Sequence, residues 1–142
     1  MTKRDLYSNV LVKQAISPVN ETGNTAHVSS IIDTKGFGSA MFVIAFGSLA
    51  DAGCTITPTV HDGDNASLTD AAEVADSCLV GTEAKATVTQ AADDSVRAIG
   101  YIGNKRYIRL TITPSGNAAD AYMSAVCVLG HPLAAPVSQS ES

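Results

Sequence analysis

Three histidines are the residues of this sequence best suited to acid–base chemistry, because imidazole titrates near neutral pH. A nucleophilic mechanism would also need a serine or cysteine beside a histidine and a carboxylate. His27, His61 and His131 all lie at expected strand ends or in the C-terminal tail, and no G-x-S-x-G motif surrounds any serine. We therefore interpret the histidines as solvated or edge residues, and we expect no catalytic residue and no enzymatic activity.

The acidic segment 61–65 could attract a hard cation, since carboxylates two residues apart can converge on one ion. If Asp62 opened an EF-hand loop, Glu73 would fill the twelfth position correctly. The sixth position, which requires glycine, is Ser67. No phosphate-binding glycine motif occurs in the sequence either. We interpret the segment as a β-turn with solvated acids, and we expect no metal and no cofactor.

The three cysteines, Cys54, Cys78 and Cys127, form no C-x-x-C pair, which excludes a zinc ribbon and a thioredoxin-type redox motif. Two interpretations stay open. The cysteines can be small buried hydrophobic residues in a reducing cell. Alternatively, one or two of them cross-link copies of the chain in an assembly that later leaves the cell. All three are therefore candidates for disulfides between subunits.

The charged residues are unevenly distributed along the chain. Between Asp51 and Asp94 nine carboxylates face a single cation, Lys85. An ordinary charged hairpin with acidic loops accounts for this pattern. A dipolar surface, with one end docking an acidic or basic neighbour, is the alternative. The cations that would form its basic end are Arg97, Lys105, Arg106 and Arg109.

Length and composition limit the class of protein to which the chain can belong. Its 142 residues fit one domain with a hydrophobic core, and 45% hydrophobic residues argue against a disordered chain. A net charge of −5 argues against a nucleic-acid partner, because binding phosphates requires clustered cations. The apolar run 40–46 is too short to cross a membrane, and no apolar stretch follows the charged N-terminus. We expect a protein made in a cytoplasm, with no membrane partner.

Short apolar segments separated by turn residues predict the strands of an all-β fold. Residues 40–46 are rich in apolar residues and predict a strand buried on both faces, and Pro58 predicts that its strand lies at an edge or a bulge. Residues 68–80 are the one stretch with helical spacing of apolar residues, and a loop with one turn is the alternative for this short segment. The predicted strands are 10–16, ended by Ser17-Pro18; 27–33; 40–46; 54–61; 96–102 and 107–113, joined as a hairpin by 103–106; and 121–129.

Strands that recur every ten to fifteen residues indicate an antiparallel β-sandwich or barrel, jelly-roll-like, with at most one short helix. The polar segment 1–9 is expected to be an N-terminal arm, and 10–129 the sandwich domain. Residues 130–142 are punctuated by prolines, so we expect a tail that cannot continue a strand.

The segment 93–114 resembles a pattern found in small structural proteins of tailed bacteriophages. Its usual companions are an upstream V-G-T-E and a closing A-V-x-V-L-G-H-P. They match Val80 to Glu83, preceded by Leu79, and residues 125–132. The similarity spans roughly residues 28–136, which is most of the expected sandwich. Cys78 and Cys127 depart from the pattern, so cross-linking by cysteine is a hypothesis for this chain alone.

The resemblance implies a capsid decoration (cement) protein on the exterior of a virion, made in the host cytoplasm. It also implies partners: the major capsid protein, which it would stabilise, and copies of itself in a dimer or trimer. A tail or head–tail connector protein and a small surface-binding module are the alternatives. No catalytic residue belongs to the pattern. The candidate capsid-contact residues are Arg97, Lys105, Arg106, Arg109, His131 and Pro132.

Overall fold

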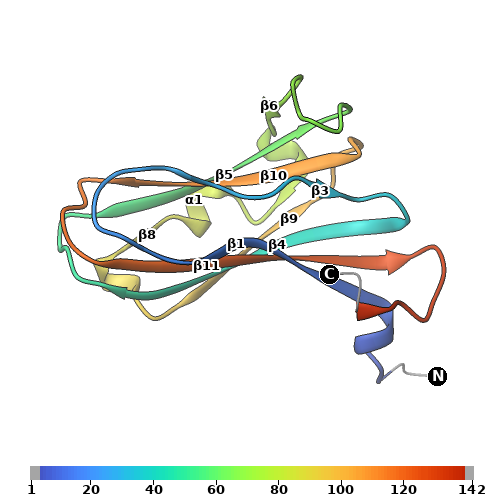
Figure 1. Ribbon diagram of the computed structural model, residues 1–142, viewed down its shortest axis with the longest axis horizontal. Coiled ribbons are helices and arrows are strands. Elements are labelled where there is room, and N and C mark those ends of the chain that lie inside the picture. Colours follow the sequence, from blue (N-terminus) through green and yellow to red (C-terminus); the bar gives the residue numbers. More distant parts are fainter. Residues whose placement is uncertain (1–3, 140–142) are drawn as a thin grey trace.

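The computed structural model describes residues 4–139, which form two β-sheets packed face to face. Figure 1 shows the layers edge on, with β5 and β10 above and β1, β4 and β11 below. The elements in chain order are the 3₁₀ turn η1 (Tyr7–Asn9), β1 (Val10–Glu21), β2 (His27–Val28), β3 (Ile32–Asp33), β4 (Phe37–Leu49), β5 (Thr55–Gly63), β6 (Ala72–Glu73), η2 (Asp76–Cys78), β7 (Leu79–Val80), α1 (Glu83–Ala86), β8 (Val88–Thr89), η3 (Gln90–Ala92), β9 (Val96–Tyr101), β10 (Tyr107–Ser115) and β11 (Ala121–Pro132).

The five-stranded sheet, called sheet A, has the order β1-β11-β4-β9-β7. The six-stranded sheet B has the order β2-β10-β5-β6, with β3 paired to β10 and β8 paired to β5. Every pairing is antiparallel, and the chain passes repeatedly from one sheet to the other, as in a jelly roll. The prediction of an antiparallel β-sandwich is confirmed, and α1 is the single α-helix within residues 4–139.

The core lies between the sheets because apolar side chains alternate along each long strand. In sheet A, Phe42 and Ile44 of β4 are fully buried, and in sheet B Val60 and Leu110 are fully buried as well. Burying a side chain of this size stabilises the fold by about 1.5–3 kcal/mol. Packing between the two apolar inner faces holds the sandwich together.

The strand 40–46 is not buried on both faces as predicted. Phe42 and Ile44 point inward, whereas Met41 and Ala45 on either side of this pair are exposed. The prediction is wrong because a sheet in a two-layer sandwich is covered on its inner side only. The apolar residues on the other side of β4 therefore remain at the surface.

The predicted hairpin between 96–102 and 107–113 is a crossover. β9 pairs with β4 in sheet A, whereas β10 pairs with β5 in sheet B. The glycine in the connection serves a close approach, because a Cβ on Gly103 would lie 2.5 Å from the hydroxyl oxygen of Tyr101. A glycine-asparagine loop signals a change of direction, and it does not specify which strands pair across it.

Residues 68–80 form no α-helix: the segment holds β6, the single 3₁₀ turn η2 and β7 within irregular backbone, so the alternative of a loop with one turn describes it better. Leu68 takes a positive φ of 50° and its side chain is buried. The Asp70 carboxylate accepts hydrogen bonds from the backbone N–H groups of Asp64 (2.9 Å) and Asn65 (3.2 Å). An aspartate that bonds nearby backbone in this way favours a turn over a helix.

Two strands continue through residues that were expected to end them. β1 continues through Pro18 to Glu21, because it is an edge strand and Pro18 lies within a register shift between Ile16 and Val19. β11 runs to Pro132, which pairs with Phe37 of β4, so the expectation that residues 130–132 cannot continue a strand is wrong. Pro132 is the last residue of the strand, and the pairing ends with it.

Pro58 lies where β5 lacks a partner on one side, as its sequence position predicts. On that side β5 pairs with β8 only at Thr55 and Ile56, and with β6 only at His61 and Asp62. The missing N–H of proline therefore costs no pairing there. The helix α1 lies beside this gap, and its Glu83 carboxylate accepts a hydrogen bond (2.8 Å) from the N–H of Val60.

Candidate interaction surfaces

Arg106 is held by an ion pair at the corner between β9 and β10. Its Nε and Nη2 both donate to the Asp33 carboxylate, each at 2.8 Å. This pair lowers the pKa of Asp33 to about 2. The Arg106 guanidinium also lies 4.9 Å from the centre of the Tyr107 ring. Arg106 is therefore anchored to its own subunit, with part of its surface exposed.

Lys105 is engaged at the same corner. Its Nζ donates to the Asp64 carboxylate at 2.7 Å, and its backbone N–H donates to the Tyr101 hydroxyl at 3.0 Å. The hydroxyl in turn donates to Asp62 at 2.6 Å, and burial raises the pKa of Tyr101. The acids of the 61–65 segment thus accept hydrogen bonds from Tyr101 and Lys105 at the corner between β9 and β10. No group of three or more potential metal ligands gathers anywhere in residues 4–139.

Arg97 and Arg109 belong to different sheets. Arg97 on β9 alternates with the exposed Val96 and Ala98, so it lies on the inward side of sheet A, and its Nε is buried. Arg109 on β10 alternates with buried residues and faces outward, opposite His61 of β5. The four cations that the sequence groups together are therefore divided between a corner and the two sheets.

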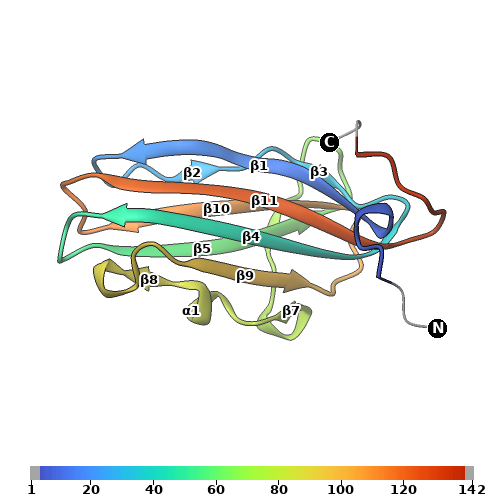
Figure 2. The ribbon, with the colours of Figure 1, turned by 90° about the horizontal axis from the view of Figure 1, so that it is seen from below.

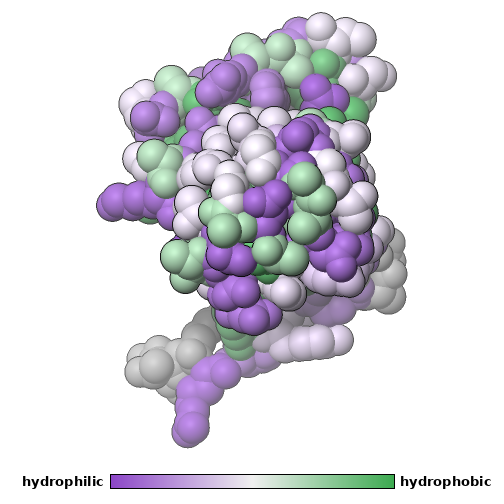
Figure 3. Space-filling model, turned by 90° about the vertical axis from the view of Figure 1, so that its left-hand side faces the viewer, coloured by the Kyte–Doolittle hydropathy of each residue, from purple (hydrophilic) through white to green (hydrophobic). Residues whose placement is uncertain are grey.

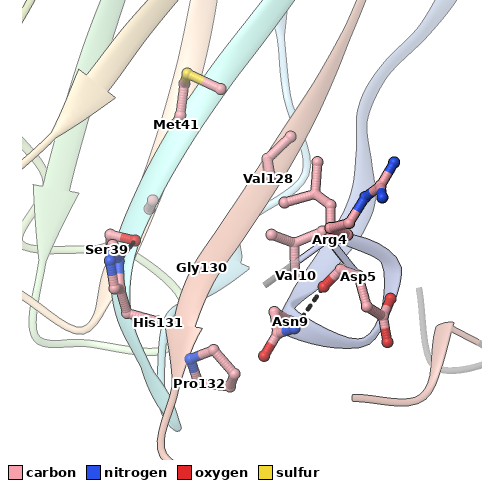
Figure 4. Close-up of a pocket in the computed structure, with 12 residues that line it drawn as sticks. Arg4, Asp5, Asn9, Val10, Ser39, Met41, Val128, Gly130, His131 and Pro132 are labelled. Carbon is pink, nitrogen blue, oxygen red and sulfur yellow. Dashed lines mark hydrogen bonds between the residues drawn. The ribbon is translucent and has the colours of Figure 1, made fainter. Parts of the chain in front are cut away.

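His131 and Pro132 line a groove of about 660 Å³ at the end of the sandwich where the two terminal segments meet (Figure 4). The groove runs between the N-terminal segment and the ends of β4 and β11. His131 takes a positive φ of 50°, and its Nδ1 lies 2.8 Å from the Ser39 hydroxyl. Arg4 and Asp5 line the polar side of the groove, and its remaining walls are mostly apolar.

The described parts of the two expected arms are bound to each other. The backbone N–H of Val137 donates to the Ser8 carbonyl at 2.9 Å. The Gln139 side chain donates to the Tyr7 carbonyl at 2.8 Å and accepts from the N–H of Val12 at 3.3 Å. Residues 1–3 and 140–142 of the expected arms lie outside the described residues. That the arms reach neighbouring subunits stays a prediction.

The three cysteines differ in exposure. Cys54 and Cys127 are buried in the core, and burial raises the pKa of Cys127 to about 12 and raises that of Cys54. Neither sulfur is accessible to a second subunit in this structure, so a cross-link through either would require the sandwich to open. Cys78, the last residue of η2, is partly exposed and is the cysteine best placed for an intermolecular disulfide.

The outer face of sheet A is apolar, a feature that the sequence pattern alone did not predict. Strand register aligns its outward residues in rows across the sheet. None of these residues is charged, and Figure 2 shows that no helix or loop crosses the middle of this face. The signal in the sequence was the lack of charge at every second residue of β4 and β11. The rows are Val12, Val128, Met41, Gly100 and Val80; then Gln14, Val126, Val43 and Ala98; then Ser124, Ala45 and Val96.

The outer face of sheet B is polar. Thr111 pairs with Thr59, Thr113 with Thr57, and Arg109 with His61, and all of them point away from the core. The end of the sandwich farthest from the termini is mixed, because hydrophilic and hydrophobic residues alternate over it in Figure 3. The outer face of sheet A is therefore distinct from both.

Comparison with known proteins shows the fold. No family model matches the chain, and no curated protein sequence matches it. A chain from the solved cyanophage Pam1 capsid asymmetric unit is 18% identical with a TM-score of 0.52, and the match covers 93% of this chain and 91% of that one. The PRD1 vertex protein P5 matches at 7% identity and a TM-score of 0.51, covering 88% and 98% of the two chains.

A longer protein contains the same sandwich as a part. The VP2 subviral particle of infectious bursal disease virus matches at 12% identity and a TM-score of 0.55, and the match covers 87% of this chain but 32% of the VP2 chain. The chain is thus a jelly-roll β-sandwich of a kind that viral structural proteins contain. Within residues 4–139 no helix is long and apolar enough to span a membrane.

Proposed function

We propose that this chain is a non-enzymatic structural protein of a virus particle, a decoration (cement) protein that binds the major capsid shell and stabilises it. The observation that carries the proposal is the match to a chain of the cyanophage Pam1 capsid over nearly the whole length of both chains. The resemblance of residues 93–114 to small structural proteins of tailed bacteriophages supports the same role.

The architecture suits this role physically. A sandwich with a continuous apolar core is rigid, and rigid units can make several weak contacts at once on a repetitive surface. Exposed apolar side chains at the end where the termini meet, Leu6, Tyr7 and Leu133, are available for such contacts. The proposed partners are the major capsid protein and copies of this chain, on the capsid exterior. The net charge of −5 favours protein over nucleic acid.

The six residues predicted from the sequence to contact the capsid belong to this proposal. His131 and Pro132 line the terminal groove, and Arg109 stands on the outer face of sheet B. Lys105 and Arg106 keep exposed surface beside their internal ion pairs. Arg97 is the weakest member of the set, because its side chain lies on the inward side of sheet A.

The decisive experiment adds the purified protein to capsid heads that lack it. We expect the protein to bind and to raise the temperature at which the heads open. An unchanged opening temperature, with no bound protein, would contradict the proposal. Arg109→Ala is expected to weaken binding, whereas Thr113→Ala on the same strand and face is the matched control and leaves binding unchanged.

Copy number in an intact particle separates this role from a tail or connector role. A decoration protein is present in hundreds of copies, whereas a connector ring holds about six or twelve. Mass spectrometry of purified particles gives this ratio to the major capsid protein. Non-reducing electrophoresis of the same particles tests Cys78, and monomer bands without reductant would exclude a covalent link between copies.

A further inference from the structure

We infer that the outer face of sheet A is the surface through which two copies of this chain associate. The inference rests on the proposed function, because a shell component acts as an assembly of copies, and it names the face that joins them. Five of the exposed large hydrophobic residues lie on this one face of the molecule. They are Val12, Met41, Val80, Val96 and Tyr122.

Electrostatics favours a second copy as the occupant of this face. The chain carries 14 acids against 9 basic residues, so two copies repel each other at most orientations. The rows of outward residues on sheet A hold no charge, and the face of a second copy holds none either. Copies that meet through these rows bring no like charges into contact there. Arg4 and Asp5 lie at the border of the face, in the groove that Met41 and Val128 also line, and they carry opposite charges.

The geometry of the face suits a two-fold contact between flat sheets. The central strand β4 presents the small Ala45 together with Met41 and Val43, and its neighbour β9 presents the small residues Ala98 and Gly100, so backbone is accessible there. Val12 stands on the edge strand β1. Two flat β-sheets pack with about 10 Å between them, as the inner faces of this sandwich do. Around a two-fold axis each residue meets the same surface in its partner, so one face serves both copies.

The area of the face is sufficient for a reversible dimer. Strands about 4.8 Å apart and outward residues about 6.8 Å apart along a strand give each outward position roughly 33 Å². About fifteen outward positions on β1, β11, β4, β9 and β7 then cover roughly 500 Å² per copy. Two copies bury about 1,000 Å², which is near the lower limit of specific interfaces. We therefore expect association that depends on concentration and that many neighbouring copies on one particle reinforce.

The test is the oligomeric state of the purified full chain, measured by sedimentation equilibrium from low micromolar to near-millimolar concentration. Val96→Glu and Ala98→Glu place a carboxylate on the outer face of sheet A. Val28→Glu is the matched control, because Val28 is 55% exposed on sheet B and Val96 is 61% exposed on sheet A. Thermal unfolding of each variant checks that the sandwich is intact.

We expect a dimer for the native chain and for Val28→Glu, and association at least about tenfold weaker for Val96→Glu and Ala98→Glu. A native chain that stays monomeric overturns the inference, as does Ala98→Glu that associates like the native chain. If the native chain is monomeric and Ala98→Glu abolishes binding to capsid heads, the face serves the shell; the inference then fails while the proposed function stands. A dimer that binds no heads supports the inference and contradicts the proposed function.

Discussion

Across the middle of sheet B, Arg109 of β10 stands beside His61 of β5 and Glu73 of β6 on the side away from the core. The corresponding side of sheet A carries residues such as Val43 and Ala98, with no charge in any row. Both sheets bury apolar side chains on their inner sides, so the need for a core does not explain the difference. A large exposed apolar face on one side of a domain is typical of a surface that meets a partner.

The largest expected effect is a difference in the free energy of unfolding between substitutions on the inner side and on the outer side of β4. Phe42→Ala removes a fully buried ring and should lower the free energy of unfolding by about 3–5 kcal/mol. Met41→Ala, one residue away on the outer face, should cost less than about 1 kcal/mol. Urea denaturation of dilute protein measures both changes. Equal costs would mean that the outer face is covered by the chain itself.

A smaller effect is expected at Val60 of β5, whose backbone N–H donates to the Glu83 side chain instead of to a neighbouring strand. Glu83→Ala leaves the buried N–H of Val60 without its acceptor, which should lower the free energy of unfolding by about 1–3 kcal/mol. Glu83→Gln keeps an acceptor and should be far less harmful. Loss of stability in the glutamine variant equal to that in the alanine variant would show that packing, rather than the hydrogen bond, is what Glu83 supplies.

The Glu83 carboxyl group also predicts a dependence on pH. Burial raises its pKa, and the neighbouring acids Glu73 and Asp76 act in the same direction. A raised pKa in the folded state means that the stability from this group is present at low pH and is lost as pH rises through that pKa. Glu83→Gln should therefore gain stability relative to the native chain as pH rises from acid to neutral, as unfolding curves across this range would show.

The ion pair between Asp33 and Arg106 should have a smaller effect on the free energy of unfolding than Glu83 has. Because the pKa of Asp33 is lowered from 3.8 to about 2, the stabilisation is present near neutral pH and is lost as pH falls through about 2. Both side chains are more than a third exposed, so water screens the pair and limits its value. Asp33→Asn should cost little at pH 7 and less near pH 2. A pH-independent cost would assign the loss to backbone contacts of Asp33.

The smallest change in stability should come from making sheet B resemble sheet A. Thr57→Val, Thr111→Val and Thr113→Val together alter outward residues only, so the free energy of unfolding should shift by less than about 1 kcal/mol. The altered face should nevertheless bind a hydrophobic dye and form assemblies larger than a dimer. If the variant associates no more than the native chain, exposed aliphatic side chains alone do not create an adhesive face here.

Local alternation predicted the strands well but not their partners. The alternation of threonine with apolar residues in 54–61 and 107–113 identified β5 and β10, because one face of each is buried and the other is wet. The pairing of β9 with β4, rather than with β10, depends on contacts between residues more than fifty positions apart. No turn signal at 103–106 contains that information.

The candidate surfaces were harder to predict for the same reason. Arg97 and Arg109 are close in sequence, yet they belong to opposite sheets. The outer face of sheet A is assembled from strands that begin at residue 10 and end at residue 132, and its rows exist only after their register is fixed. The sequence shows that residues 40–46 are apolar. It does not show whether one face or both faces of this strand are covered in the fold.

The hydrogen bonds that join Gln139 to the backbone of Tyr7 and Val12 have a consequence for engineering. Because the described ends of the chain lie side by side, a short linker could close them, and new ends could be opened in the exposed loop 24–26 at the far end of the sandwich (Figure 1). Cargo fused beyond both described ends would lie at the same end of the sandwich. Such fusions would leave the middle of both outer faces free. The fused protein could then carry its cargo and still associate through the outer face of sheet A.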